Sequence, residues 1–344
     1  MKIQTICVLG GSGFVGRALV SRLAASGKQV RIPSRKRERS KELILLPTVE
    51  VIEADIHDDR ELVRQFRGMD AVINLVGNLH GERRDGAKAQ TQQQGGFERC
   101  HVELPRKVAQ ACAEAGVGRL LHMSALGASA TSPSAYQRSK AAGETIVREA
   151  GLRKGKSEGS ARSESGRNPG SGIDVTIFRP SVIFGREDSF FNLFAQLVRW
   201  FPVFPLANAQ ARFQPVWVED VARAISERLE DRDSFGQTYE LCGPRVYSLR
   251  EIVEYAAHLQ ELHTRIIPLS DRLSFLQAWA MEFKPGAKLM TRDNHHAMQQ
   301  DNVCQGQWPF GFAPTAIEAV VPTYLGRQSP RARYYAFRGH ARRR

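Results

Sequence analysis

Cysteine is scarce in this sequence and forms no pattern. A disulfide framework uses an even set of cysteines at regular spacing, and zinc sites use close Cys or His pairs. His122, His295 and His296 also lack a third ligand at a useful spacing. We therefore expect no disulfide framework, no metal site, and a reducing compartment such as the cytoplasm. The five cysteines in the 344 residues are Cys7, Cys100, Cys112, Cys242 and Cys304.

Long apolar runs are also missing. No run approaches the roughly 18 residues needed to cross a bilayer. The chain enters a strand-like segment at residues 3–9 without the basic region and long apolar stretch of a secretory signal. We expect a protein that is neither secreted nor membrane-spanning, although peripheral contact with a membrane stays open.

Positive charge is concentrated in three segments. The formal charge is +13, and the basic excess lies in residues 31–42, 151–172 and 327–344, the last with seven arginines and no acid. The rest of the chain is nearly neutral, so a basic face for nucleic acid is not expected. A solvated terminus is the simpler interpretation of the tail, with contact to anionic lipid or an acidic partner as the alternative.

Strand-like runs alternate with helical periodicity in the first half of the chain. Repeated strand, crossover helix and parallel strand predict an α/β fold, a Rossmann-type doubly wound parallel sheet with ligands at the carboxyl ends of its strands. The strands are expected at 3–9, 29–33, 49–53, 71–76, 119–124 and 173–178, and the helices at 13–26, 59–67, 99–115 and 136–149.

The chain is expected to contain a nucleotide-binding domain and a smaller C-terminal lobe. The first would cover residues 1–235 and the second 236–326, followed by the basic tail at 327–344. Residues 151–172 are rich in Gly, Ser, Arg and Lys, which predicts a surface insertion. Residues 81–96 have no period and follow a strand, where an active-site lid is possible.

A glycine-rich turn directly follows the first strand. Its first glycines permit a tight turn and close approach to a pyrophosphate, and Gly16 lets the next helix pack against the sheet. The phosphates would then meet the free N–H groups of the helix N-terminus. We expect this turn to bind a nicotinamide dinucleotide through Gly10, Gly11, Ser12, Gly13, Phe14, Val15 and Gly16.

The end of the second strand carries cations in place of an acid. An acid there would contact the adenosine ribose of NAD, whereas a basic side chain accommodates the 2′-phosphate of NADP. Ser34 and Arg35 follow the strand and no acid occurs before Glu38. Arginine binds phosphate by two charge-assisted hydrogen bonds. NADPH is therefore the expected cofactor, with NADH possible; the alternative is that these cations only solvate a loop.

Three residues have the spacing of an acid–base site. Ser124 ends a predicted strand, and Tyr136 and Lys140 lie four residues apart on one face of a predicted helix. A tyrosine needs a neighbouring cation to exchange a proton near neutral pH, and Lys140 is that cation. We expect Tyr136 to act as general acid or base, Lys140 to activate it and to bind ribose, and Ser124 to orient a substrate carbonyl or hydroxyl.

These motifs together resemble the extended or atypical short-chain dehydrogenases/reductases, which include epimerase/dehydratase-like proteins. The resemblance runs from residue 7 to about 225 and includes Arg179-Pro-Ser-Val-Ile-Phe-Gly and Val216-Trp-Val-Glu-Asp-Val. Many extended members have an asparagine where this chain has His101, so a relay role there does not carry over. The resemblance implies further cofactor contacts from Asp55, Ile56, Leu75, Val76, Gly77, Pro180, Ser181 and Ile183.

A narrower resemblance is to the nucleotide-binding accessory subunits of respiratory complex I and their bacterial relatives. It rests on residues 184–188 with Phe191 and Asn192, on residues 290–293, and on the missing acid after the second strand. The leading hypothesis is an NADPH-dependent oxidoreductase acting on an unidentified carbonyl, secondary alcohol or quinone-like compound. The alternatives are a non-catalytic NADPH-binding subunit or assembly factor of a respiratory membrane complex, and a regulator that senses the redox state of the cofactor.

Two apolar segments have no assigned role. Residues 200–206 begin Trp-Phe-Pro, and residues 273–283 have apolar side chains at helical spacing. Such segments usually pack into a core. We expect core packing for both, with an isoprenoid-binding or membrane-docking face as the alternative.

Overall fold

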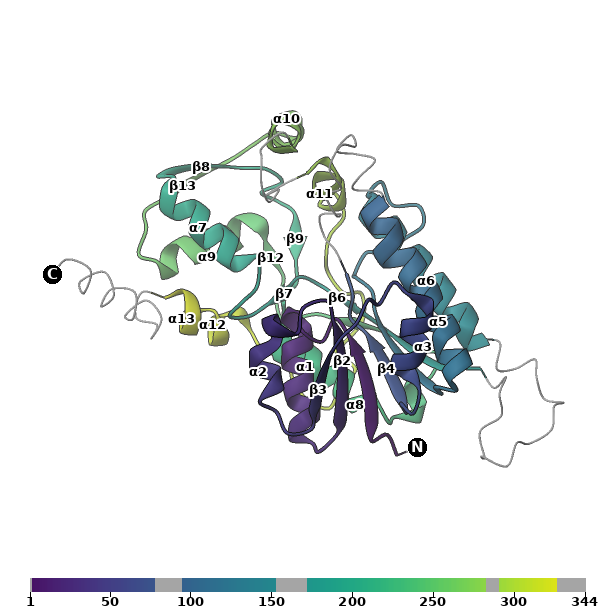
Figure 1. Ribbon diagram of the computed structural model, residues 1–344. Coiled ribbons are helices and arrows are strands. Elements are labelled where there is room, and N and C mark those ends of the chain that lie inside the picture. The colour runs from purple at the N-terminus through teal and green to yellow at the C-terminus, as the bar shows by residue number, and fades with distance from the viewer. Residues whose placement is uncertain (1, 78–94, 153–171, 283–290, 327–344) are drawn as a thin grey trace, which may run out of the picture. The chain divides into compact units, whose positions relative to one another are not determined.

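The computed structural model describes residues 2–77, 95–152, 172–282 and 291–326 (Figure 1). Most of the predicted lid at 81–96, most of the predicted insertion at 151–172, and the basic tail lie outside the described residues. The elements below follow the labels of Figure 1.

A seven-stranded sheet organises the first part of the chain, with strand order β11-β6-β5-β4-β1-β2-β3. All pairings from β3 through β6 are parallel. After the edge strand β3, the chain crosses back and places β4 beside β1. This strand order is that of a Rossmann-type sheet, which confirms the predicted fold class. The strands are β1 (Thr5–Leu9), β2 (Gln29–Ser34), β3 (Val49–Glu53), β4 (Ala71–Asn74), β5 (Arg119–Met123), β6 (Asp174–Pro180) and β11 (Thr238–Leu241).

Helices cover this sheet, and two of their ends carry recognisable capping residues. The Asp58 side chain accepts a hydrogen bond from the Glu61 N–H at the start of α3, and Gly116 takes φ +71° after α5. Apolar side chains of α3, α5 and α6 pack with those of β1, β4, β5 and β6 in one buried cluster. In Figure 1, α1 lies on the opposite side of the strands from α3, α5 and α6. These helices are α1 (Phe14–Ala25), α3 (Asp59–Phe66), α5 (Leu104–Ala115) and α6 (Ala135–Leu152).

One predicted helix differs in its start and its form. The backbone is already helical at residue 95, the first residue described after residue 77, and Arg99–Glu103 is a π-helical turn that continues into α5. A π-helical turn inserts an extra residue into a helix and is common at functional sites. Periodicity alone did not predict it.

The chain divides into two compact units by its internal contacts. One consists of Met1–Arg179 with Val221–Glu240, and the other of Pro180–Asp220 with the chain from Leu241 onward. A single boundary near residue 235 was expected. The division is discontinuous because α8 (Val218–Glu227) and β11 return the chain to the first unit after residues 180–220 have joined the second.

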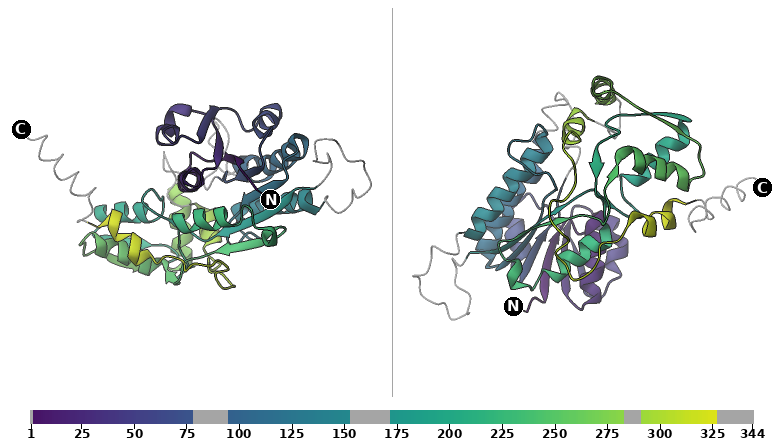
Figure 2. Two further views of the ribbon diagram at one scale, coloured as in Figure 1. Left: turned by 90° about the horizontal axis from the view of Figure 1, so that it is seen from below. Right: turned by 180° about the vertical axis from the view of Figure 1, so that it is seen from behind.

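The second unit has its own apolar core. Side chains of α7, β8, α9, β13 and the helices near residue 320 form one buried cluster that includes Phe191, Phe204, Ile252 and Val321. Its elements are β7 (Ile183–Phe184), α7 (Phe191–Trp200), β8 (Val203–Leu206), β9 (Arg212–Phe213), β10 (Val216–Trp217), β12 (Tyr247–Ser248), α9 (Leu249–Leu259), β13 (Arg265–Pro268), α10 (Asp271–Glu282), α11 (Arg292–Ala297), α12 (Ile317–Val320) and α13 (Pro322–Leu325). Figure 2 gives two further views of these elements.

The second unit contains a disulfide, contrary to the expectation from cysteine spacing. Cys242 and Cys304 are joined although they lie 62 positions apart in sequence. Backbone hydrogen bonds bring them together, because Gln214 accepts from the Gly243 N–H and its side chain accepts from the Cys304 N–H. Cys7, Cys100 and Cys112 are buried and are not part of this disulfide.

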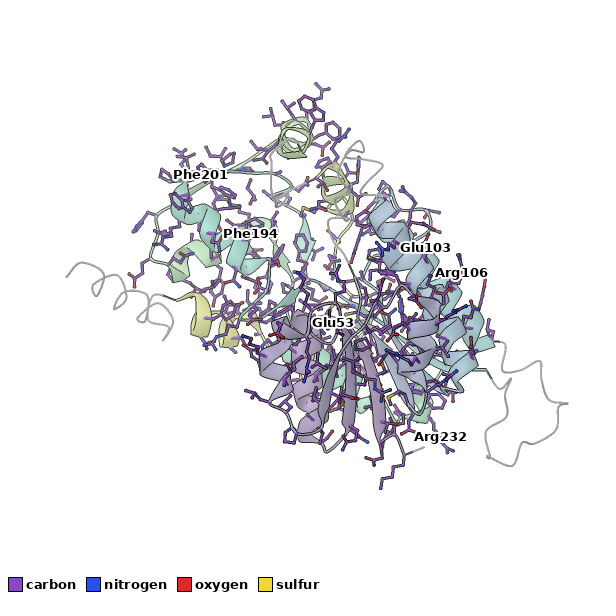
Figure 3. The ribbon with its side chains drawn as sticks, in the orientation of Figure 1. Glu53, Glu103, Arg106, Phe194, Phe201 and Arg232 are labelled. Atoms are coloured by element: carbon purple, nitrogen blue, oxygen red, sulfur yellow. A yellow bond between two sulfur atoms is a disulfide. The ribbon has the colours of Figure 1, made fainter. Side chains whose placement is uncertain are left out.

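The two apolar segments are not core helices or strands throughout, which corrects a second expectation. Trp200 and Phe201 are exposed, and so is much of the apolar side of α10 at Leu273, Leu276 and Trp279. Side chains of a strand point alternately to its two faces. In β8, Phe204 and Leu206 are accordingly buried, whereas Val203 is exposed. Figure 3 shows Phe201 at the edge of this unit and Phe194 within α7. Within the described residues, no helix combines the length and apolarity that a membrane span requires.

Candidate nucleotide site

The turn between β1 and α1 leaves room only for glycine. Gly10 has φ +78°, and a Cβ on Gly16 would lie 2.3 Å from the Gly10 carbonyl oxygen and 2.5 Å from that of Gly11. Added carbon atoms essentially never approach an oxygen so closely, so the helix packs against the turn only because Gly16 has no side chain. The turn is closed by a hydrogen bond of 2.9 Å from the Gly13 N–H to the Gly10 carbonyl.

The N-terminus of α1 is suited to an anion. Gly13 is the exposed N-cap residue, and no side chain caps the first turn. No acidic residue occurs in that turn, so the helix dipole is not opposed there. A glycine cradle at such an end fits the pyrophosphate of a dinucleotide. Ser12, Phe14 and Val15 are partly buried around it.

The end of β2 places Arg35 and Lys36 on the surface. Both are exposed. Arg31, within β2, donates to the Glu50 carboxylate at 3.2 Å and to the Gln65 carbonyl at 3.0 Å. The register pairs Ser34 with Glu53 of β3, an exposed acid at the same edge of the sheet (Figure 3). The sequence at the end of β2 did not predict this carboxylate, because Glu53 belongs to β3 and the register between the two strands cannot be read from either strand's own sequence.

The turns after β3 and β4 are held by their own side chains. Asp55 is exposed and its carboxylate accepts a hydrogen bond from the His57 N–H, next to the half-buried Ile56. After β4, the Asn74 side chain accepts from the Val76 N–H at 3.1 Å. Leu75 and Val76 are partly buried, and Gly77 is exposed.

Lys140 is buried beside the end of β5. Its ammonium donates to the Met123 carbonyl at 3.3 Å, and a Cβ on Gly77 would lie 3.2 Å from its Nζ. Burial lowers the pKa of Lys140 to about 8, although nearby Cys100 and Glu144 act in the opposite direction. The lysine therefore lies near the carboxyl ends of β4 and β5.

Tyr136 lies one turn before Lys140 on α6 and is half-buried. Its ring makes edge contacts with the rings of His101 and Phe97, at centroid distances of 5.4 and 5.7 Å. Phe97 and His101 stack on each other at 5.6 Å. These aromatic neighbours orient the phenol ring.

Ser124 lies deeper than its predicted role suggests. Its N–H donates to the Phe178 carbonyl at 2.7 Å, and its hydroxyl oxygen is buried without a hydrogen-bond partner of ordinary length. Glu144, one turn beyond Lys140, lies near that hydroxyl. Ser124 is therefore held inside the fold close to Glu144.

A buried ion pair supports the helix that carries Lys140. The Nε and Nη2 atoms of Arg179 donate to the two carboxylate oxygens of Glu144, at 2.7 and 2.6 Å. Arg148 donates a third hydrogen bond to this carboxylate, at 3.2 Å. Burial raises the pKa of Glu144, but the hydrogen bonds from Arg179 and the other neighbours outweigh it, so its pKa is lowered and the carboxylate is charged. Sequence reasoning missed Glu144; its spacing four residues after Lys140 on the same face was the available signal.

Two histidines, His101 and His122, lie near Lys140. His122 of β5 is buried and lies 3.3 Å from the Asn74 amide nitrogen, and burial with the charge of Lys140 lowers its pKa to about 3. His101, from the π-helical turn, lies close to Ser139 of α6. The turn and α6 approach so closely that a Cβ on Gly143 would be 2.1 Å from the His101 carbonyl oxygen. Gly143 thus permits the contact between the two helices.

The predicted residues after β6 belong to the second unit. Pro180 ends β6, Ile183 is half-buried in β7, and the Ser181 hydroxyl donates to the carbonyl and the side chain of Asn302. The Val182 N–H also donates to the Asn302 side chain. These contacts describe how residues 180–183 are held within their own unit.

The motif at residues 184–188 has a structural role. The buried Asp188 carboxylate accepts hydrogen bonds from the N–H groups of Gly185, Phe190 and Asn192, and from the Tyr324 hydroxyl at 2.9 Å. Burial raises the pKa of Asp188 despite these donors. The motif shapes the start of α7.

No group of three or more potential metal-ligating side chains gathers within the described parts of the chain. His295 is buried in the second unit and contacts Asn208 at 3.1 Å and Asp271 at 3.5 Å.

Comparison with known proteins identifies the family. A model of the NAD dependent epimerase/dehydratase family matches residues 6–242, a range that covers all of the seven-stranded sheet except Thr5. The chain belongs to this family. This result confirms the resemblance drawn from the glycine turn and from Ser124, Tyr136 and Lys140.

Its relatives include respiratory-complex proteins and one reductase. NADH dehydrogenase [ubiquinone] 1 alpha subcomplex subunit 9, mitochondrial, is 32% identical in Mus musculus over 324 residues, covering 90% of this chain and 77% of the relative. A NADH-ubiquinone oxidoreductase 40 kDa subunit of Neurospora crassa is 30% identical, covering 73% of this chain and 59% of that protein. Ceramide reductase of Caulobacter vibrioides is 30% identical, covering 77% of this chain and 74% of the relative.

Solved structures share the fold. A UDP-glucuronic acid 4-epimerase from Bacillus cereus in complex with UDP-glucuronic acid and NAD superposes with a TM-score of 0.62, at 17% identity, covering 78% of this chain and 86% of that one. The dTDP-glucose 4,6-dehydratase DesIV from Streptomyces venezuelae, with NAD bound, gives 0.61 at 20% identity, covering 79% and 86%. At these identities the likeness concerns the fold.

Proposed function

We propose that the protein binds NADPH in its first unit and serves as a nucleotide-binding subunit or assembly factor of respiratory complex I. The similarity to subunit 9 over 90% of this chain carries the proposal. The glycine turn would hold the pyrophosphate, Arg35 the 2′-phosphate, and Tyr136 with Lys140 the nicotinamide ribose. A bound nicotinamide would supply or accept a hydride, but the subunit role does not require turnover.

Native-gel separation of detergent-solubilised cells tests this role directly. We expect the protein to migrate with a large NADH-oxidising complex and to stay there after a salt wash. The purified protein should also retain NADPH. Migration of the whole population as a free protein, in cells that assemble the complex normally, would rule out the subunit role. If deletion of this protein then prevented assembly of the respiratory complex, the protein would be an assembly factor; normal assembly without it would exclude that role as well.

A second candidate function is NADPH-dependent reduction of a carbonyl compound. It is favoured by the presence of Tyr136 and Lys140 on one helix beside Ser124, and by the similarity to a ceramide reductase. Tyr136 would exchange the proton at the substrate oxygen, with the Lys140 charge favouring the phenolate. Turnover screened with carbonyl and quinone-like compounds should disappear in Tyr136→Phe while NADPH binding persists. Retained turnover in that variant would exclude Tyr136 as the acid–base group.

Cofactor preference gives a sharp prediction at the end of β2. NADPH should bind more tightly than NADH, because the exposed Arg35 can pair with the 2′-phosphate. Arg35→Asp should weaken NADPH binding about 10- to 150-fold and leave NADH binding nearly unchanged, since one charge-assisted contact contributes about 1.5–3 kcal/mol. Titration calorimetry measures both constants, and Arg37→Asp, an exposed neighbour, is the matched control. Equal affinities for the two cofactors in the unmodified protein would contradict the assignment.

The lowered pKa of Lys140 predicts how NADPH affinity changes with pH. The folded-state pKa is about 8, below the ordinary lysine value, so the ammonium is charged at pH 7 and loses its proton as the pH rises through about 8. The charged hydrogen bond from the Lys140 ammonium to the nicotinamide ribose is then lost. NADPH affinity should fall several-fold between pH 7 and pH 9.5. The Lys140→Met variant should bind NADPH weakly, and its affinity should not fall over this pH range. The same fall in affinity in that variant would assign the pH dependence to another group.

A further inference from the structure

Tyr136, Lys140 and Glu144 follow one another at four-residue intervals along α6, so they share one face of that helix. Only 3% of Glu144 and 4% of Lys140 is exposed. Side chains at this spacing start about 5–6 Å apart at their Cβ atoms. Opposite charges so close together and so far from water interact more strongly than the same pair on a surface. Each of the two buried groups therefore affects the charge of the other.

The Glu144 carboxylate is held in its charged form and in one orientation. Arg179 of β6 donates to both of its oxygens, at 2.7 and 2.6 Å. Arg148 donates to it at 3.2 Å and also donates to the Thr238 hydroxyl of β11 at 2.9 Å. Burial acts to raise the pKa of Glu144, but the hydrogen bonds to its charged form outweigh burial and the pKa is lowered. The negative charge therefore stays at a fixed place beside α6.

Other titratable groups face Lys140 from neighbouring elements. Cys100 and His101 come from the π-helical turn, and His122 comes from β5. Burial, with the charge of Lys140, lowers the pKa of His101 to about 2 and that of His122 to about 3, so both rings are neutral at pH 7. An ordinary thiol also keeps its proton at pH 7. Among these neighbours, Glu144 is the group that brings a full negative charge to Lys140 at neutral pH.

We propose that Glu144 is a positioning residue of the candidate site, and that its carboxylate, fixed by Arg179, keeps the buried Lys140 ammonium charged at neutral pH. Without this carboxylate, burial would favour the neutral amine, which offers a weaker hydrogen bond to any ligand. Arg179 contributes to the site from β6 by acting on Glu144. The role of Lys140 in holding the nicotinamide ribose rests on the proposed function, whereas the charge of Lys140 can be measured without a ligand.

NMR of the whole chain with isotope-labelled lysine side chains measures the titration of Lys140 directly, and Lys140→Met identifies its signal. In the unmodified protein this signal should titrate at about pH 8. Glu144→Gln keeps the size of the side chain and removes its charge, so its Lys140 should bind the proton about 10- to 100-fold more weakly. Glu144→Asp keeps the charge and should recover most of that loss. Glu149→Gln, the same change at an exposed position of α6, should leave the titration unchanged.

Calorimetric titration with NADPH over the same pH range gives a second readout. The fall in NADPH affinity that accompanies loss of the Lys140 proton should begin at a lower pH in Glu144→Gln than in the unmodified protein. If the unmodified protein does not bind NADPH, the proposed function fails, and the NMR titration still decides whether Glu144 controls the charge of Lys140.

An unchanged Lys140 titration in folded Glu144→Gln would overturn the proposal even if that variant melts at a lower temperature, because a purely structural role changes stability without changing the charge of Lys140. A weaker proton in Cys100→Ser but not in Glu144→Gln would assign the counter-charge to the thiol. If Glu144→Gln does not fold, combining it with Arg179→Gln removes both charges and leaves no guanidinium unpaired. The Lys140 proton should again bind more weakly, since Arg179 acts through Glu144, and an unchanged titration there would also overturn the proposal.

Discussion

Replacing Gly16 with valine should abolish dinucleotide binding. A Cβ at this position would lie 2.3 Å from the Gly10 carbonyl oxygen and 2.5 Å from that of Gly11, so the glycine turn and the start of α1 must separate. Neither neighbour can yield by a side-chain rotation, because both contacts are to backbone. The N–H groups that would contact the pyrophosphate then lose their arrangement. We expect NADPH affinity to fall at least about 100-fold, equal to about 3 kcal/mol, as measured by calorimetry.

The matched control adds the same side chain to a glycine with space around it. Gly306 is exposed and has no heavy atom within 4 Å of a built Cβ. Gly306→Val should therefore bind NADPH like the unmodified protein. The packing argument would be wrong if Gly16→Val bound NADPH normally, or if the two variants lost affinity to the same degree.

Removing Arg119 should destabilise the first unit more than any surface substitution. This arginine is fully buried at the start of β5 and its guanidinium lies 4.6 Å from the Phe235 ring centroid. Burial lowers its pKa to about 10, so it stays charged at neutral pH. Arg119→Met leaves several buried acceptors unpaired, and we expect a loss of about 3–5 kcal/mol in the free energy of unfolding. Its hydrogen-bond acceptors belong to Asp174, Thr176, Arg228, Leu229 and Ser234.

Urea unfolding followed by circular dichroism measures this loss as a lower midpoint. Arg64→Met is the control, because Arg64 pairs with Glu61 at 2.8 Å on an exposed helix surface. Exposed ion pairs contribute little, so the control should change stability by no more than about 0.5 kcal/mol. Equal midpoints for Arg119→Met and Arg64→Met would show that the buried network does not hold β5 to residues 228–235.

The regular parts of the fold were predictable from the sequence because their signals are local. β3 (Val49–Glu53) has the bounds expected from its apolar run, and α5 ends before Gly116, whose φ of +71° is the left-handed value that favours glycine. The glycine turn was also predictable, since its spacing between a strand and a helix has one well-known packing purpose. The family match agrees with these local signals.

The arrangement around Lys140 was only partly predictable. The four-residue spacing to Tyr136 follows from helix geometry, but the contact of Lys140 with Met123 and Gly77 depends on how α6 lies across the ends of β4 and β5. His101 enters the same cluster through a π-helical turn, whose extra residue rotates the helix face. A periodicity argument assumes regular helix and so assigns that side chain a different direction.

The sequence by itself determined the parallel sheet, the glycine turn, and the residue types that such a site uses, because strand periodicity, turn glycines and helix spacing act over a few neighbouring positions. Only the tertiary structure decided which distant groups meet. It paired Cys242 with Cys304, set Glu53 beside Ser34, joined Glu144 to Arg179, and left Trp200 exposed. Each of these depends on strand register or helix packing between segments far apart in the chain, and no local pattern records such contacts.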